Sequence, residues 1–208
     1  MKRILCYGDS NTGGYISGTD HLRYAENKRW TGLLAKNLGR KYQVIEEGLN
    51  SRTLYSVDKR PGREGRVGFD YLKPCLDTHD KIDCFVLMLG TNEFKADYDN
   101  AAEQIAQMLV KFIEYIKNYK SQIDKTAPKL IVSGVALVNE NTEYAKKDGM
   151  YNGANEKSVN LNVLMKKYCQ ENGISYIDNT DLEVGVDGVH FTEQSHKILA
   201  QRIYERVK

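Results

Sequence analysis

A serine and a histidine–aspartate pair stand near opposite ends of this chain, at Ser10 and at Asp187 and His190. A serine hydroxyl is a poor nucleophile near neutral pH, so it needs a neighbouring base that takes its proton as it attacks. An imidazole is suited to this task, and an aspartate can hold its Nδ1–H and stabilise the imidazolium. Together these residue types could attack a carbonyl carbon.

Attack on an ester carbonyl places negative charge on oxygen, and each preorganised N–H donor that stabilises this charge is worth roughly 10² to 10³ in rate. The sequence offers three donors, namely the backbone N–H groups of Ser10 and Gly48 and the side-chain amide of Asn92. A glycine at position 48 lets the main chain approach a substrate without a Cβ in the way. We expect these donors to form an oxyanion hole.

Five short apolar runs predict the strands that position these residues, at 3–7, 42–46, 83–89, 129–136 and 174–178. Their lack of strict polar–apolar alternation is typical of strands buried on both faces. Apolar residues at three- and four-residue spacing predict helices at about 29–38, 68–79, 98–120, 154–172 and 192–207. This alternation predicts an α/β fold, a three-layer α/β/α sandwich with a five-stranded parallel, flavodoxin-like sheet.

The predicted topology also brings the reactive groups together, because the loops after parallel strands open on one edge of the sheet. The first strand leads to Ser10, the second to Gly48 and the third to Asn92. The chain after the fifth strand leads to Asp187 and His190. Each motif alone has an ordinary structural explanation, since Asp and Ser cap helices and Asp-Gly pairs form turns. Their convergence favours catalysis.

The motifs stand in the order of the four sequence blocks of the SGNH hydrolases, also called the GDSL-like esterase family: Gly8-Asp9-Ser10, Gly48, Gly90-Thr91-Asn92 and Asp187-x-x-His190. The resemblance covers nearly the whole chain. It is closest to the arylesterase and acyltransferase branch, through Arg29-Trp30 and the residues flanking the last three blocks.

This resemblance implies that Ser10 is the nucleophile, His190 the base and Asp187 the acid, with the oxyanion hole at Ser10, Gly48 and Asn92. It also implies a carboxylic ester hydrolase that uses no metal or other cofactor. The expected substrate is a small carboxylic ester with a short acyl, aryl or sugar acetyl group. Acyl transfer from the acyl-enzyme to an alcohol is a further expected outcome.

The chain departs from the family just after the proposed nucleophile. The family usually has Leu where Asn11 stands, and this branch commonly has Trp near Gly13-Gly14-Tyr15. Glu93 replaces the more frequent Asp of the third block. We expect Asn11, Tyr15 and Asn50 to contact the substrate, and the segments 15–24 and 139–153 to line the acyl pocket.

Two other interpretations stay open. A non-catalytic flavodoxin-like module would bind an anion or a flavin phosphate at residues 8–14, but Asp9 would then place negative charge beside that phosphate. An α/β-hydrolase is disfavoured because the chain has no Gly-x-Ser-x-Gly motif.

Several other residues could compete for roles in the site. Asp178 and Asp181 are the rival acids, and the remaining histidines are His21, His79 and His196. The basic run at 59–66, with Arg60 and Arg63, could border the site or a subunit contact, although we favour a solvated loop.

Composition narrows the class of protein. The net charge is +2, with 30 Lys and Arg interspersed with 28 Asp and Glu, which argues against nucleic acid and membrane surfaces as partners. Cysteines at 6, 75, 84 and 169 without a C-x-x-C pair indicate buried reduced thiols rather than disulfides or zinc.

Length and hydropathy complete the expectations. A chain of 208 residues suits one domain, 1–208, with its own core. No apolar run is long enough for a signal peptide or a bilayer span, so we expect a cytoplasmic protein. The arylesterase-like branch often forms homo-oligomers, and the loop at 59–68 is a candidate contact.

Overall fold

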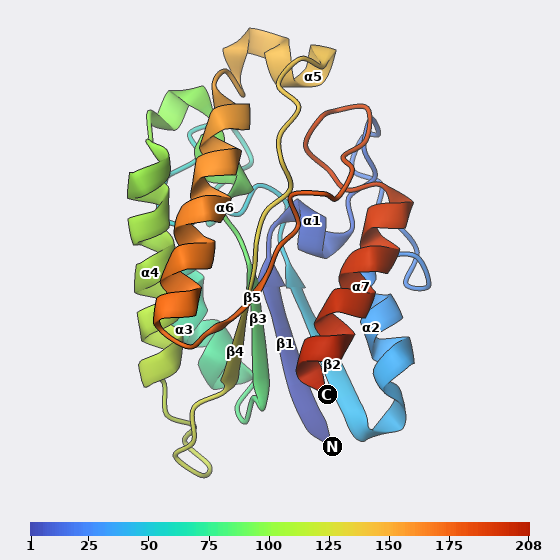
Figure 1. Cartoon of the computed structure of the whole chain (residues 1–208), viewed down its shortest axis with the longest axis vertical. Coiled ribbons are helices and arrows are strands. Elements are labelled where there is room, and N and C mark those ends of the chain that lie inside the picture. The colour runs from blue at the N-terminus through green and yellow to red at the C-terminus, as the bar shows by residue number, and fades with distance from the viewer.

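Five parallel strands form one sheet at the centre of the molecule (Figure 1). The computed structural model describes all residues from Met1 to Lys208. The strands are β1 (Lys2–Gly8), β2 (Tyr42–Gly48), β3 (Cys84–Met88), β4 (Lys129–Ser133) and β5 (Ser175–Ile177), in the order β2-β1-β3-β4-β5. Every neighbouring pair is parallel, which confirms the predicted sheet.

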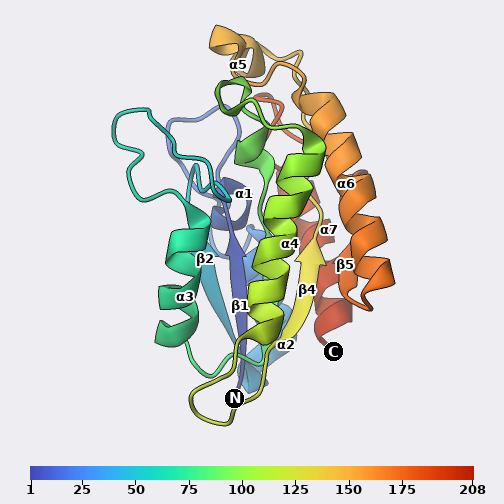
Figure 2. The same ribbon diagram turned by 90° about the vertical axis from the view of Figure 1, so that its left-hand side faces the viewer.

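Helices cover both faces of this sheet, as Figures 1 and 2 show. One face packs against α3 (Gly68–Thr78), α4 (Ala102–Asn118) and α6 (Ala154–Glu171). The other packs against α2 (Trp30–Leu38) and α7 (Glu193–Val207). Successive strand residues point to opposite faces, so Leu5 and Tyr7 of β1 belong to one core cluster and Ile4 and Cys6 to the other. The three-layer architecture is therefore confirmed.

Short elements lie in the loops after β1, β3 and β4 and in the connection from α2 to β2. They are the helices α1 (Ser10–Gly13) and α5 (Glu143–Lys146) and the 3₁₀ turns η1 (Gly39–Lys41), η2 (Thr91–Phe94), η3 (Ala96–Tyr98) and η4 (Lys147–Gly149). The helix expected from 98 begins at Ala102 instead, because η3 ends at Tyr98 and the next residue, Asp99, has a positive φ of 49°. A left-handed residue interrupts the helical path.

Two further observations bear on the composition. All four cysteines are free and buried, as the sequence predicts. None of the helices is long and apolar enough to cross a bilayer.

Candidate active site

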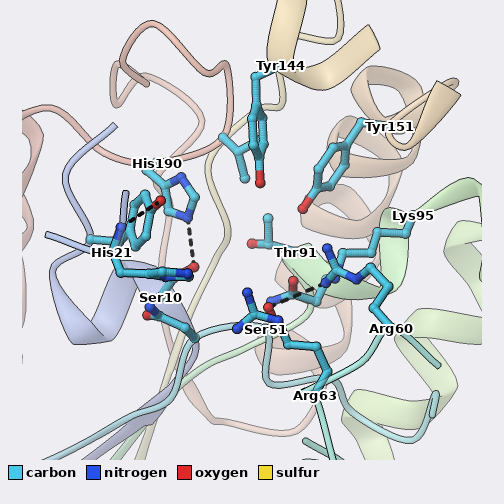
Figure 3. A pocket seen from close by; sticks show the side chains of 14 residues that line it. Ser10, His21, Ser51, Arg60, Arg63, Thr91, Lys95, Tyr144, Tyr151 and His190 are labelled. Carbon is cyan, nitrogen blue, oxygen red and sulfur yellow. Dashed lines mark hydrogen bonds between the residues drawn. The ribbon is translucent and has the colours of Figure 1, made fainter. Parts of the chain in front are cut away.

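Ser10, His190 and Asp187 form a continuous chain of hydrogen bonds at the carboxyl edge of the sheet. Figure 3 shows the contact between Ser10 and His190. Ser10 Oγ lies 2.8 Å from His190 Nε2, and His190 Nδ1 lies 2.7 Å from Asp187 Oδ2. An ionised carboxylate only accepts hydrogen bonds, so Nδ1 carries the hydrogen. Nε2 of the neutral ring is then free to accept the proton of Ser10.

The backbone around Asp187 holds its carboxylate in place. Asp187 Oδ1 accepts hydrogen bonds from the N–H groups of Val189 and His190, both at 3.0 Å. Burial alone raises the pKa of Asp187, but the hydrogen bonds and charge of His190 outweigh it and hold that pKa well below its usual range. The carboxylate therefore stays ionised and orients the ring. The Tyr15 ring packs against the imidazole ring of His190, with the two ring centroids 4.3 Å apart.

Ser10 is presented by a tight turn at the end of β1. Asp9 caps α1, because its Oδ1 accepts a hydrogen bond from the N–H of Asn11 at 2.9 Å. Burial raises the pKa of Asp9 to about 6. Arg52 supports the turn from below by donating from Nη1 to the carbonyl of Gly8 at 2.9 Å. A carboxylate thus already occupies the start of α1, which disfavours a flavin phosphate there.

The three predicted oxyanion donors lie close to this turn. The N–H of Ser10 opens α1 and has no intrahelical acceptor. Asn92 lies in η2 and lines the cavity, and its Nδ2 donates to the carbonyl of Arg52 at 3.0 Å, which leaves a second amide hydrogen. Gly48 packs against α1, where a Cβ would collide with the backbone of Gly13. Gly48 is not itself a lining residue of the cavity.

A small cavity of about 60 Å³ opens beside Ser10. Its wall contains 14 residues, including the predicted Tyr15 and Asn50. The segment predicted to line the pocket at 139–153 contributes Tyr144 and Tyr151. The wall is mostly polar, since only 4 of its residues are hydrophobic.

Comparison with known proteins places this arrangement in a family. The sequence profile of the GDSL-like Lipase/Acylhydrolase family matches residues 6–198. The chain belongs to the GDSL-like lipase/acylhydrolase family. It is a carboxylic ester hydrolase.

Solved structures of this GDSL-like family agree over the whole chain. The aryl esterase of M. smegmatis is 31% identical with a TM-score of 0.89, and the match covers 100% of this chain and 98% of that one. A carbohydrate acetylesterase from Sinorhizobium meliloti is 30% identical with a TM-score of 0.90, over 100% and 98% of the two chains. A comparison with curated protein sequences finds no match.

One predicted contact residue of this GDSL-like chain lies elsewhere. Asn11 was expected to contact the substrate, but it is buried and does not line the cavity. Its Oδ1 accepts from the N–H of Phe191 at 2.9 Å, and its Nδ2 donates to the carbonyl of Val189 at 3.2 Å. Asn11 therefore ties the turn of Ser10 to the segment that carries His190. The sequence around Asn11 did not indicate these contacts, because their partners lie about 180 positions away.

The basic loop at 59–66 is also placed differently from the favoured expectation. Arg60 and Arg63 line the cavity instead of being wholly solvated, which fits the alternative that this loop borders the site. Lys95, which follows η2, joins them and is buried. The number of basic residues at 59–66 indicated that this loop could border the site. Whether their side chains face the cavity depends on how the loop folds back, which the sequence does not show.

The rival residues have other partners. Asp178 pairs with Lys166 at 3.1 Å, and Asp181 pairs with Arg202 at 2.6 Å. Among the other histidines, His21 lines the cavity, His79 bonds a glutamate, and His196 is fully buried. Neither aspartate bonds His190.

One group of side chains has the composition of a metal site. Ligand atoms of Glu47, Cys75 and His79 lie within 4.8 Å of one another. Glu47 Oε1 already lies 2.9 Å from His79 Nε2, and Glu47 Oε2 lies 3.7 Å from the Arg52 guanidinium. The Glu47 carboxylate therefore already has a cationic partner in Arg52 and a hydrogen-bond partner in His79. Glu47, Cys75 and His79 do not line the cavity beside Ser10.

Proposed function

We propose that this enzyme hydrolyses esters of short acyl groups through an acyl-enzyme at Ser10. The observation that carries the proposal is the unbroken pair of contacts from Ser10 Oγ to His190 Nε2 at 2.8 Å and from His190 Nδ1 to Asp187 at 2.7 Å. Ser10 and His190 line a cavity large enough for a small substrate group, and Asp187 lies buried behind the imidazole.

The reaction has two halves. Ser10 Oγ attacks the carbonyl carbon while His190 Nε2 takes its proton, and the carbonyl oxygen gains the negative charge. The N–H groups of Ser10 and Gly48 and the amide of Asn92 stabilise that oxyanion. His190 then protonates the departing alcohol oxygen, which leaves the acyl group on Ser10. Water repeats the sequence in reverse and frees the acid.

The size and polarity of the cavity support a short acyl group. A space of about 60 Å³ with a mostly polar wall suits an acetyl-sized group far better than a long alkyl chain. The neighbours named as an aryl esterase and a carbohydrate acetylesterase fit this substrate class. An alcohol that reaches the acyl-enzyme in place of water would accept the acyl group.

The test combines covalent labelling with a series of esters. A fluorophosphonate should label the wild-type protein at Ser10, located by peptide mass spectrometry, and should leave Ser10→Ala unlabelled. The wild type should hydrolyse 4-nitrophenyl acetate with a higher kcat/KM than the butyrate, and the butyrate faster than the octanoate.

Two outcomes would contradict the proposal. One is an unlabelled wild-type protein after prolonged exposure, and the other is a Ser10→Ala variant with full activity. Added methanol should convert part of the acetyl product to methyl acetate, and its absence would remove acyl transfer from the proposal.

A further inference from the structure

Three cationic side chains line the cavity beside Ser10, while no aspartate or glutamate does. They are Arg60 and Arg63 of the loop after β2 and Lys95 after η2. Figure 3 shows them on the side of the cavity opposite His190. The catalytic steps described above use none of these charges.

One buried carboxylate balances part of this charge. Asp58 binds Arg60 through two contacts, Nη2 to Oδ2 at 2.6 Å and Nε to Oδ1 at 2.9 Å. The Nζ of Lys95 lies 3.4 Å from the same carboxylate. A bidentate pair of this kind is among the stronger ionic contacts. Asp58 therefore secures Arg60 and Lys95, but one carboxylate cannot neutralise two cations and a third nearby.

Arg63 is the group left without a protein partner. Its guanidinium makes no hydrogen bond and no ion pair with the rest of the chain, although its side chain is only half-exposed. Holding a cation partly out of water costs free energy unless an anion compensates it. The same positive surroundings act on Lys95, where burial and then the charge of Arg60 lower the pKa to about 8.

We propose that the alcohol part of the substrate carries a carboxylate, which Arg63 binds with the support of Arg60 and Lys95. The inference rests on the proposed function, because a short acyl group leaves the alcohol part to carry the charge. A planar guanidinium matches a carboxylate with two parallel hydrogen bonds, as Arg60 already does with Asp58. The substrate class is the acyl ester of a hydroxycarboxylic acid.

The test compares two esters that differ in charge at one position. They are 4-acetoxyphenylacetate and its uncharged amide, in which a methylene group separates the substituent from the phenol and keeps the two leaving groups similar. The wild type should prefer the carboxylate by about tenfold in kcat/KM, an amount typical of one close charge pair. Arg63→Gln should reduce this preference by about the same factor, whereas Arg63→Lys should retain part of it.

A matched control lies on the same loop. Lys59 is exposed and does not line the cavity, so Lys59→Gln removes the same charge without touching the subsite. The preference of this variant should equal that of the wild type. If Lys59→Gln lowers the preference as much as Arg63→Gln does, a general surface field explains it and the subsite is wrong.

A binding measurement separates this proposal from the esterase proposal. Calorimetry should show that the wild type binds 4-hydroxyphenylacetate more tightly than 4-hydroxyphenylacetamide, and that Arg63→Gln loses the difference. Equal hydrolysis of both esters would overturn the carboxylate subsite and leave the esterase standing. Arg63-dependent binding of the carboxylate without hydrolysis of either ester would do the opposite. If the wild type neither binds the carboxylate in preference to the amide nor hydrolyses either ester, both proposals are overturned.

Discussion

The proposed oxyanion donor Asn92 is held in place by a hydrogen bond within the protein. It is buried, and its Nδ2 bond to the carbonyl of Arg52 at 3.0 Å fixes the plane of the amide. Arg52 in turn donates to the carbonyl of Gly8, two residues before Ser10. In the mechanism that we propose, the Asn92 donor and the Ser10 nucleophile therefore share one hydrogen-bonded support, so little reorganisation is needed as the oxyanion forms.

Replacement of Asn92 by alanine tests this role. We expect Asn92→Ala to lower kcat for 4-nitrophenyl acetate by about 10² to 10³, because one oxyanion donor is lost. Steady-state kinetics on folded protein measures the effect. The control is Asn179→Ala, which removes an equally buried amide that bonds Ser133 and Gly134 away from the cavity. Similar losses of kcat in both variants would indicate a general effect of buried amides and contradict the oxyanion role.

Helices α2 and α7 meet at His196, directly after the segment that carries His190. The N-cap residue Arg29 gives α2 no side-chain cap, and His196 Nδ1 instead accepts the N–H of Trp30 at 3.3 Å. His196 Nε2 is buried without a partner. Burial, followed by the charges of His190 and Arg29, lowers the pKa of His196 to about 4. This histidine is therefore a neutral cap between two helices.

The lowered pKa predicts a loss of stability in mild acid. In the unfolded chain the imidazole takes up a proton near its ordinary pKa of about 6.5, whereas in the folded protein it stays neutral down to about 4. The contribution of neutral His196 to the free energy of unfolding is complete above the pKa of the unfolded chain. It is lost as the pH falls from about 6.5 towards 4. When the pH is lowered from 7 to 5, we expect the free energy of unfolding of the wild type to fall by about 2 kcal/mol more than that of His196→Asn.

Urea denaturation of both proteins at the two pH values measures this difference. Asparagine has no proton to gain but still offers an acceptor near the Nδ1 position. Other groups that titrate in this range, including the buried Asp9, are common to both proteins and cancel. Equal losses of unfolding free energy would show that His196 is not the responsible group.

At the scale of the whole molecule, the sheet separates two apolar clusters that enclose all four cysteines. Cys6 and Cys84 lie in the cluster under α2 and α7, and Cys75 and Cys169 in the cluster under α3, α4 and α6. Burial raises the pKa of Cys75 to about 12 and that of Cys169 to about 11. Because the thiolate is the reactive form, these thiols are protected by protonation as well as by packing.

Thiol titration tests the integrity of both clusters together. With Ellman's reagent near pH 8, we expect the native protein to show no fast-reacting thiol, and the denatured protein to show all four. The denatured sample is the internal control for total thiol. A native thiol that reacts as fast as free cysteine would contradict the burial of that residue.

The sequence by itself determined the succession of strands and helices along the chain. It also determined the edge of the sheet on which the reactive groups meet. Apolar runs and helical spacing are local, and right-handed crossovers convert them into one topology. The motifs around Ser10, Asn92 and His190 could be predicted for the same reason, since each directly follows a strand or lies in a loop at that edge.

Only the tertiary structure decided what the side chains between these motifs contact. Asn11 bonds residues about 180 positions away, and it therefore supports the backbone instead of the substrate. Arg63 and Lys95 come to one cavity from separate loops, and Asp58 pairs with two of the three cations there but not with Arg63. Periodicity and composition carry no information on such long-range pairs. The carboxylate preference that we propose for this ester hydrolase depends on them.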